Sequence, residues 1–176
     1  MIRLLALLAA LFVAAPAQAQ SDPQNTLVLE TTKGNVVIRL RNDIAPEHAN
    51  RIKQLARDGF YNNVPFHRVI PGFMAQTGDG DRGNGTGKSK YPNLKSEFSQ
   101  LPFKRGVIGM ARASEPNSAN CQFFIAYADA PHLNGQYTVV GEVVSGMDNV
   151  DKIKKGEPVA DPDKITRAFV QADGKK

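Results

Sequence analysis

Tryptophan is absent from this chain of 176 residues, and there are only one cysteine, Cys121, and three histidines. One cysteine cannot form a disulfide within the chain. The sequence has no cluster of metal-ligating residues and no plausible Ser/His/Asp arrangement, so we predict no metal, no other cofactor and no hydrolase. Cys121 stands beside Gln122 and Phe123, which favours a small, largely buried residue over a catalytic thiol.

No block of five or more like charges occurs, although Lys and Arg number 22 against 17 Asp and Glu, for a net charge of +5. A modest and scattered excess of positive charge is typical of a solvated surface. We therefore expect no nucleic-acid partner.

No apolar run reaches the roughly 20 residues that a membrane-spanning helix needs. The longest run, Leu4 to Ala15, follows a short basic start and precedes the small-residue site Ala17-Gln18-Ala19. This order predicts a signal peptide over residues 1–19, cleaved after Sec-type export. Residues 20–176 would then form one domain in the periplasm, or in the medium, with no stable membrane association. An uncleaved N-terminal anchor is the alternative.

Short strands and turns dominate the rest of the chain. Leu27–Thr32 and Asn35–Leu40 are separated by Lys33-Gly34, which predicts a hairpin. One helix is predicted from Pro46 to a stop at Gly59, with Arg51 on its surface, and a second over Met147–Lys155. Further strands are predicted over residues 106–111, 123–127, 137–144 and 165–170. Without repeats or linkers, this pattern predicts a single, mainly β domain, a closed antiparallel barrel.

The stretch from Phe66 to Gly80 is the most informative part of the sequence. Arg68 precedes a Pro-Gly turn, and in the strand that follows Met74 and Gln76 share one face because side chains alternate. Gln122 and Phe124 share a face in a second stretch of the same kind. If these faces meet, they form an apolar pocket rimmed by amides and one guanidinium, which suits a reaction that cleaves no bond.

Three segments together resemble the signature of the cyclophilins, which are peptidyl-prolyl cis-trans isomerases. They are Phe66–Asp79 (FHRVIPGFMAQTGD), Asn84–Gly87 (NGTG) and Gln122–Ile125 (QFFI). The resemblance runs from about Leu27 to about Val170. It implies an eight-stranded β-barrel capped by two α-helices, and a monomer that acts on proline-containing unfolded or flexible polypeptides.

The resemblance also implies roles for individual residues. Arg68 would be the catalytic residue, with Gln76 helping to position the substrate. Substrate binding would involve a proline pocket of Phe73, Met74, Phe124 and Leu133, and main-chain contacts from Ala111, Arg112 (through its backbone) and Gln122. Without the resemblance, the apolar residues would be interpreted as ordinary core and Arg68 as part of a surface salt bridge. His67 is interpreted as structural, since it points away from Arg68 on an extended chain.

The chain departs from the family at two positions that shape the pocket. His132 stands where many members carry tryptophan, and Tyr137, which we also assign to substrate binding, where many eukaryotic members carry histidine. These departures put cyclosporin sensitivity in doubt.

The glycine-rich segment from Gly78 to Lys90 matches two nucleotide-binding patterns imperfectly. Residues 78–83 fit the dinucleotide-binding pattern G-x-G-x-x-G, but the two aspartates within them would repel phosphate. Residues 82–89 approach a P-loop, but Arg82 stands where its first glycine is required. A calcium loop also fails, because Lys90 stands where glutamate is required. We predict instead a long surface loop that walls the site.

Two functions from different classes remain. The first is an isomerase that assists the folding of exported proteins, and the second is a non-catalytic chaperone that binds proline peptides. Arg68 distinguishes them, because a pure binding protein does not need a cation aimed at the amide.

Overall fold

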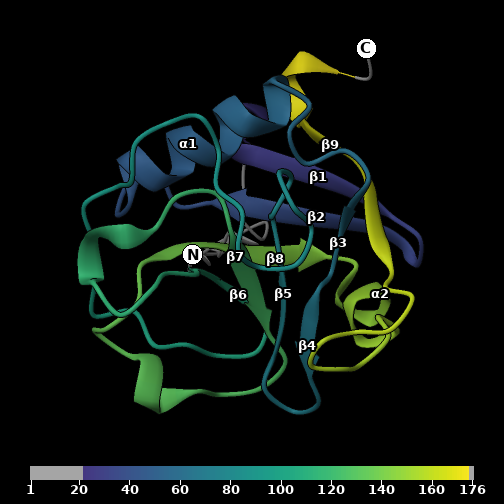
Figure 1. Ribbon diagram of the computed structural model, residues 1–176. Helices are drawn as coiled ribbons and strands as arrows, with labels where there is room; N and C mark the ends of the chain where they lie inside the picture. Colours follow the sequence, from purple (N-terminus) through teal and green to yellow (C-terminus); the bar gives the residue numbers. More distant parts are fainter. Residues whose placement is uncertain (1–21, 175–176) are drawn as a thin grey trace, which may run out of the picture.

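Figure 1 shows the computed structural model, which describes residues 22–174. The predicted signal peptide and its cleavage site therefore lie outside the described residues. Within residues 22–174, no helix is both long and apolar enough to cross a membrane.

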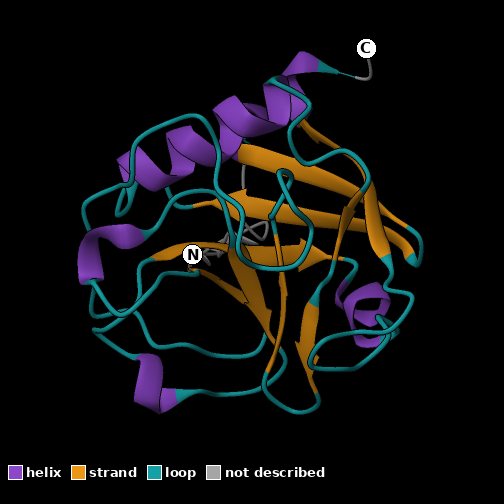
Figure 2. Cartoon of the chain, viewed as in Figure 1, coloured by secondary structure: helices purple, strands orange, loops and turns teal. Residues whose placement is uncertain are grey.

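Nine strands form one antiparallel sheet, in the order β3-β9-β1-β2-β8-β6-β7-β5-β4. Figure 2 shows these strands curling into a half-barrel. The strands are β1 (Thr26–Thr31), β2 (Gly34–Leu40), β3 (Val64–Pro65), β4 (Arg68–Ile70), β5 (Met74–Thr77), β6 (Val107–Met110), β7 (Phe123–Ala126), β8 (Val139–Ser145) and β9 (Lys164–Val170).

The expected closed, eight-stranded barrel is wrong in its strand count and its closure. No ladder joins the edge strands β3 and β4 among the described residues. The two strands follow each other in the chain, with only Phe66 and His67 between them. These two residues are hydrogen-bonded to the 156–163 segment instead. Phe66 N donates to Asp163 O, and Val159 N donates to His67 O. The interruption leaves β3 paired with β9 and β4 paired with β5.

Two α-helices pack against the sheet, as predicted. Helix α1 (Pro46–Arg57) lies against β9, and α2 (Met147–Asp151) lies against β2. Helix α2 is shorter than predicted, since the chain leaves the helix after Asp151 and Gly156 pairs with Val69 on β4.

The apolar stripe of α1 is buried as predicted, but the surface position predicted for Arg51 is wrong. Its side chain is buried and donates from Nη1 to the carbonyl oxygens of Pro92, at 2.9 Å, and Asn120, at 3.3 Å. The Tyr91 ring also lies 5.2 Å from the guanidinium. These loop partners are distant in sequence, so helical periodicity could not reveal them.

The core has two parts. The larger cluster lies between the sheet and α1. It includes alternate side chains of β1 and β2, such as Leu27, Leu29, Val36 and Ile38. The smaller cluster is set apart and contains Met74, Phe103, Phe124, Ala130, Leu133 and Val139. Three of its members, Met74, Phe124 and Leu133, were predicted from the sequence to line a pocket, so the smaller cluster supports the candidate site.

Candidate active site

Three neighbouring strands bring the central side chains of the site together. Arg68 on β4 lies opposite Gln76 on β5, and Gln76 lies opposite Phe124 on β7. Side chains at opposite positions of antiparallel strands share a face and approach closely. The predicted meeting of the two patterned stretches is therefore confirmed, with Arg68, Gln76 and Phe124 in one row.

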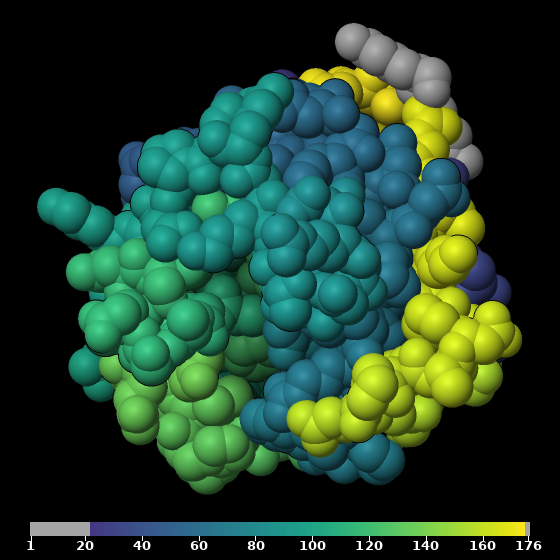
Figure 3. Space-filling view, viewed as in Figure 1, coloured from purple at the N-terminus to yellow at the C-terminus, as the bar shows by residue number. Residues whose placement is uncertain are grey.

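This row forms part of a pocket in the surface. The lining residues are Arg68, Phe73, Met74, Gln76, Ala111, Arg112, Phe124, His132, Leu133 and Tyr137. All the site residues expected from the sequence are present except Gln122, which lines the adjoining pocket. Figure 3 shows a hollow between the blue-teal surface of the segment around β4 and β5 and the green surface of residues 110–135.

The floor of this pocket is apolar and well packed. Met74, Phe124 and Leu133 are buried, and the ring of Phe124 stacks on Phe103 with 5.7 Å between centroids. Tyr137 meets the same ring edge-on at 6.0 Å. These residues are thus core residues that also line the pocket. A rigid aromatic wall of this kind suits a small apolar ring such as that of proline.

His132 was not assigned to substrate binding from the sequence, but it lines the pocket. Its ring packs against Phe73, with 5.4 Å between centroids. The departure from tryptophan had indicated that this position shapes the pocket, and its place in the lining agrees with that.

Arg68 stands half-exposed at the rim of the pocket. Its Nε donates to Glu157 Oε1 at 2.5 Å, and its Nη1 donates to Gln76 Oε1 at 3.4 Å. The surface salt bridge considered for Arg68 therefore exists, alongside its place in the pocket. Among residues 22–174, no group accepts a hydrogen bond from Nη2, so this donor is available to a ligand.

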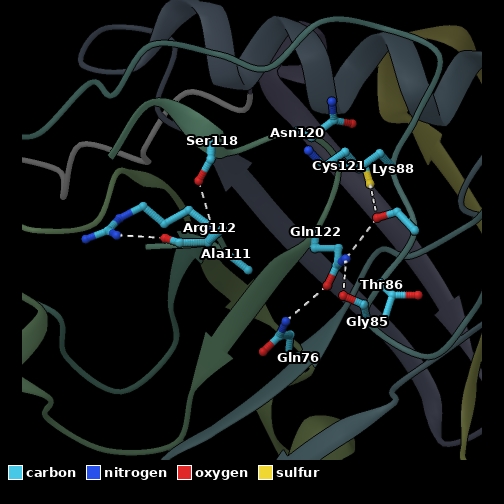
Figure 4. A pocket seen from close by; sticks show the side chains of 12 residues that line it. Gln76, Gly85, Thr86, Lys88, Ala111, Arg112, Ser118, Asn120, Cys121 and Gln122 are labelled. Atoms are coloured by element: carbon cyan, nitrogen blue, oxygen red, sulfur yellow. Dashed lines mark hydrogen bonds between the residues drawn. The ribbon is translucent and has the colours of Figure 1, made fainter. Parts of the chain in front are cut away.

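A network of amides connects Arg68 to the glycine-rich loop, as Figure 4 shows in part. Gln76 Nε2 donates to Gln122 Oε1 at 3.1 Å, and Gln122 Nε2 donates to Gly85 O at 3.0 Å and to Gly87 O at 3.1 Å. Each amide donates onward in the same direction, which fixes the orientation of both side chains. Gln122 thus supports Gln76 and anchors the loop.

The adjoining pocket in Figure 4 shares Gln76, Ala111 and Arg112 with the apolar pocket. Residues 85–88 of the glycine-rich loop form one of its walls, which confirms the predicted role of this loop. The Arg112 side chain packs over the Tyr137 ring at 4.5 Å and donates to Gln136 O. It therefore fixes the aromatic wall, which is a contribution beyond the main-chain contact expected from the resemblance.

The carboxylate of Asp79 organises the glycine-rich loop. It accepts hydrogen bonds from five backbone N–H groups, those of Asp81, Arg82, Asn84, Gly85 and Gly87. A Cβ on Gly87 would lie 2.1 Å from Asp79 Oδ1, so glycine is required there. The N–H groups that a phosphate would need are thus satisfied by the protein itself. Burial alone would raise the pKa of Asp79, but these donors outweigh it and lower the pKa from 3.8 to about 2.

We expect Asp79→Asn to destabilise the protein at neutral pH by about 1–3 kcal/mol, because its amide nitrogen would face N–H donors. The carboxylate of the native protein has a pKa of about 2, below its ordinary value of 3.8. Its stabilising effect is therefore present above about pH 4 and is lost as the pH falls towards 2. Urea unfolding at pH 6 and pH 2.5 checks this. An equal difference between the two proteins at both pH values would contradict the assignment.

His67 lies on the other side of β4 from Arg68 and lines neither pocket. Its ring is buried, and both ring nitrogens lack hydrogen-bond partners within the described part of the chain. Burial lowers the pKa of His67, so the ring is neutral at physiological pH. The side chain packs against Gly85, where a Cβ would lie 3.0 Å from Nε2. These contacts agree with the structural interpretation of His67.

Cys121 is buried, as the sequence predicted, and burial raises the pKa of its thiol to about 11. The thiolate is the reactive form, and at pH 8 only about one protein molecule in a thousand would carry it. We expect thiol reagents such as DTNB to label the folded protein far more slowly than free cysteine, with no loss of activity. Rapid labelling that abolishes activity would show that this region opens or takes part in the reaction.

The comparisons with known proteins agree with this geometry. The sequence profile of the family described as "Cyclophilin type peptidyl-prolyl cis-trans isomerase/CLD" matches residues 26–170. A "Probable peptidyl-prolyl cis-trans isomerase" from Brucella suis is 55% identical over 190 residues, covering 97% of each chain. A "Peptidyl-prolyl cis-trans isomerase" from Helicobacter pylori is 41% identical over 133 residues, covering 73% of this chain and 80% of its own.

Solved structures show the same relationship. A cyclophilin from Hirschia baltica superimposes with a TM-score of 0.80 at 28% identity, covering 88% of this chain and 76% of that chain. A Cryptosporidium parvum cyclophilin-type isomerase, crystallised in the presence of the dipeptide Ala-Pro, superimposes with a TM-score of 0.76 at 28% identity. The match covers 82% of this chain and 98% of that chain. This chain therefore belongs to the cyclophilins. It is a peptidyl-prolyl cis-trans isomerase, an enzyme that accelerates rotation about the amide bond before proline.

Proposed function

We propose that Arg68 is the catalytic residue and that the apolar pocket holds the proline ring of the substrate. The observation that carries this proposal is the position of the guanidinium at the rim of the pocket, with Nη2 free of partners among residues 22–174. Phe73, Met74, Phe124 and Leu133 would surround the ring. Ala111, Arg112 and Gln122 would bind the adjoining main chain, and Tyr137 would close the pocket.

The chemistry follows from the electronic structure of the amide. Conjugation makes the C–N bond partly double, so uncatalysed rotation takes tens to hundreds of seconds. In the twisted transition state conjugation is lost and the prolyl nitrogen becomes a hydrogen-bond acceptor. A donor fixed beside that nitrogen stabilises the twisted state more than either planar state. No covalent intermediate is needed.

The required effect is moderate. Rotation within milliseconds needs an acceleration of roughly 10⁴–10⁵, which corresponds to about 6–7 kcal/mol. A charged donor at the nitrogen, removal of water from the amide and fixed orientation in the pocket could supply this together. Gln76 would contribute by holding Nη1 of Arg68 on the pocket side.

A direct test measures exchange between the cis and trans forms of a proline peptide by NMR line shapes, with no coupled protease. We expect catalytic amounts of the residue 20–176 protein to broaden and merge the cis and trans signals. A non-catalytic chaperone would instead shift the signals by binding, with the exchange rate unchanged.

The physiological substrates that we propose are proline-containing, unfolded or flexible segments of exported proteins. A Cryptosporidium parvum relative was crystallised in the presence of the dipeptide Ala-Pro, which supports a proline-containing peptide as the ligand here. We further propose that the protein acts in the periplasm as a single-domain monomer, without nucleic acid or stable membrane association. The signal-like residues 1–19 support the location.

The export proposal predicts cleavage after Ala19. N-terminal sequencing of the protein recovered from the periplasm should begin at Gln20, because Ala17-Gln18-Ala19 follows the apolar run as a signal-peptidase site does. Protein that keeps Met1 and remains with the membrane fraction would argue for the anchor instead.

A further inference from the structure

The segment after α2 runs alongside the strand that carries Arg68, as Figure 1 shows for the loop beside β4. Val69 and Gly156 exchange two backbone hydrogen bonds of 2.8 Å each. Val159 N also donates to His67 O at 3.1 Å. Three backbone hydrogen bonds therefore hold residues 156–159 in a fixed register with residues 67–69.

This register places Glu157 opposite Arg68. In an antiparallel pairing of Val69 with Gly156, the next opposite positions are 68 and 157, and they share a face. Val69 is fully buried, so the neighbouring side chains face outward. The turn is tight, because a Cβ on Gly156 would lie 2.8 Å from Pro158 O. The backbone thus fixes the position from which the Glu157 side chain extends towards Arg68, in contrast to a charged residue on a free loop.

Glu157 makes the shorter of the two contacts with the guanidinium. Its Oε1 lies 2.5 Å from Arg68 Nε, whereas Gln76 Oε1 lies 3.4 Å from Nη1. The second distance is at the long limit for a hydrogen bond, while the first is well within hydrogen-bond distance and joins two opposite charges. Glu157 is therefore the nearer of the two side chains that hold the guanidinium of Arg68.

We propose that Glu157 is a positioning residue for the isomerisation: it holds Arg68 by Nε so that Nη2 faces the bound X-Pro amide. The inference rests on the catalytic role proposed above for Arg68. A free arginine side chain samples many rotamers, and Arg68 is half-exposed. A misplacement of about 1 Å can reduce a rate by up to about a hundredfold, so a restraint at Nε can affect catalysis without touching the substrate.

The test is a double-mutant cycle with Glu157→Ala, Arg68→Ala and both together, measured by peptide exchange. We expect Glu157→Ala to lower kcat/KM about three- to tenfold with peptide affinity within about twofold, because the restraint acts on the transition state. Glu157→Gln keeps an acceptor oxygen and should therefore lower kcat/KM less than Glu157→Ala does. In the Arg68→Ala background, Glu157→Ala should have no further effect. The Arg68 Nε–H resonance should also exchange with water faster in Glu157→Ala.

A matched control is available on two other strands of the sheet, β2 and β8. Arg39 Nη2 and Glu142 Oε1 form a similarly exposed ion pair, also at 2.5 Å, and line neither pocket of the site. Glu142→Ala should keep the wild-type rate. A wild-type or higher rate in Glu157→Ala, or an equal loss with and without Arg68, would overturn the positioning role. A wild-type rate in Arg68→Ala would instead overturn the catalytic role on which it rests.

Discussion

Replacing Arg68 with alanine should lower kcat/KM at least tenfold, equivalent to roughly 1.4 kcal/mol or more, while peptide affinity changes much less. The planar amide of the bound peptide gains little from a donor at its nitrogen, because that nitrogen accepts hydrogen bonds only after twisting. The Arg68 side chain is 39% exposed at the rim, and the proline ring would bind to the apolar floor below it. Loss of the guanidinium therefore removes transition-state stabilisation and leaves the binding surface in place.

Arg68→Lys should also lower kcat/KM at least tenfold, although lysine keeps the positive charge. Arginine offers five donors in a planar array, so Nε can bind Glu157 while Nη2 remains available to the substrate. A lysine ammonium is a single, strongly hydrated group that cannot occupy both places. Substantial activity in this variant would mean that charge alone is sufficient.

Peptide exchange and peptide affinity, measured by NMR on one proline peptide, give both halves of this prediction. Protein folding is the necessary control. Arg68→Ala should change the free energy of unfolding by less than about 1 kcal/mol, since exposed ion pairs contribute little to stability. Wild-type exchange rates in a folded Arg68→Ala protein would remove the mechanism and leave the binding-only chaperone as the better description of the pocket.

Much of this site could be predicted because its geometry is local. The turn at Pro71-Gly72 lies midway between Arg68 and Gln76, so a hairpin about this turn pairs them directly. The alternation of side chains then puts Met74 on the same face as Gln76. The pairing of β5 with β7 joins segments about fifty residues apart and is not local. The assignment of Ala111, Arg112 and Leu133 to the site likewise came from the resemblance to cyclophilins.

The features that could not be predicted depend on contacts between distant, irregular segments. Glu157 is 89 residues from Arg68, in a sequence that indicates only a helix stop and a turn. The burial of Arg51 likewise depends on carbonyl groups of two loops. The break between β3 and β4 arises where Phe66 and His67 pair with residues 159–163. None of these contacts leaves a periodic pattern in the sequence.

The second large effect is expected for Phe124→Ala. This substitution should change the affinity for the peptide more than the rate of rotation about the bound amide. Its ring is 5% exposed and separates Phe103 from the pocket, with Tyr137 against its edge. Phe124→Ala should open the pocket floor to water and remove much of the apolar contact with proline. The expected loss is on the order of 1.5–3 kcal/mol of binding free energy, or about a ten- to hundredfold weaker Kd.

The same substitution should destabilise the fold by about 3 kcal/mol, at the lower end for Phe→Ala, because one side of the ring already faces the pocket. Phe124→Leu retains more of the volume and keeps the test possible if the alanine variant unfolds. Phe123→Leu is the matched control, since Phe123 is the neighbouring residue on β7, fully buried on the opposite face in the larger core cluster. We expect Phe123→Leu to lower stability with unchanged peptide affinity, and Phe124→Leu to weaken affinity several-fold. Equal affinities in the two variants would mean that proline binds somewhere other than the floor formed by Phe124.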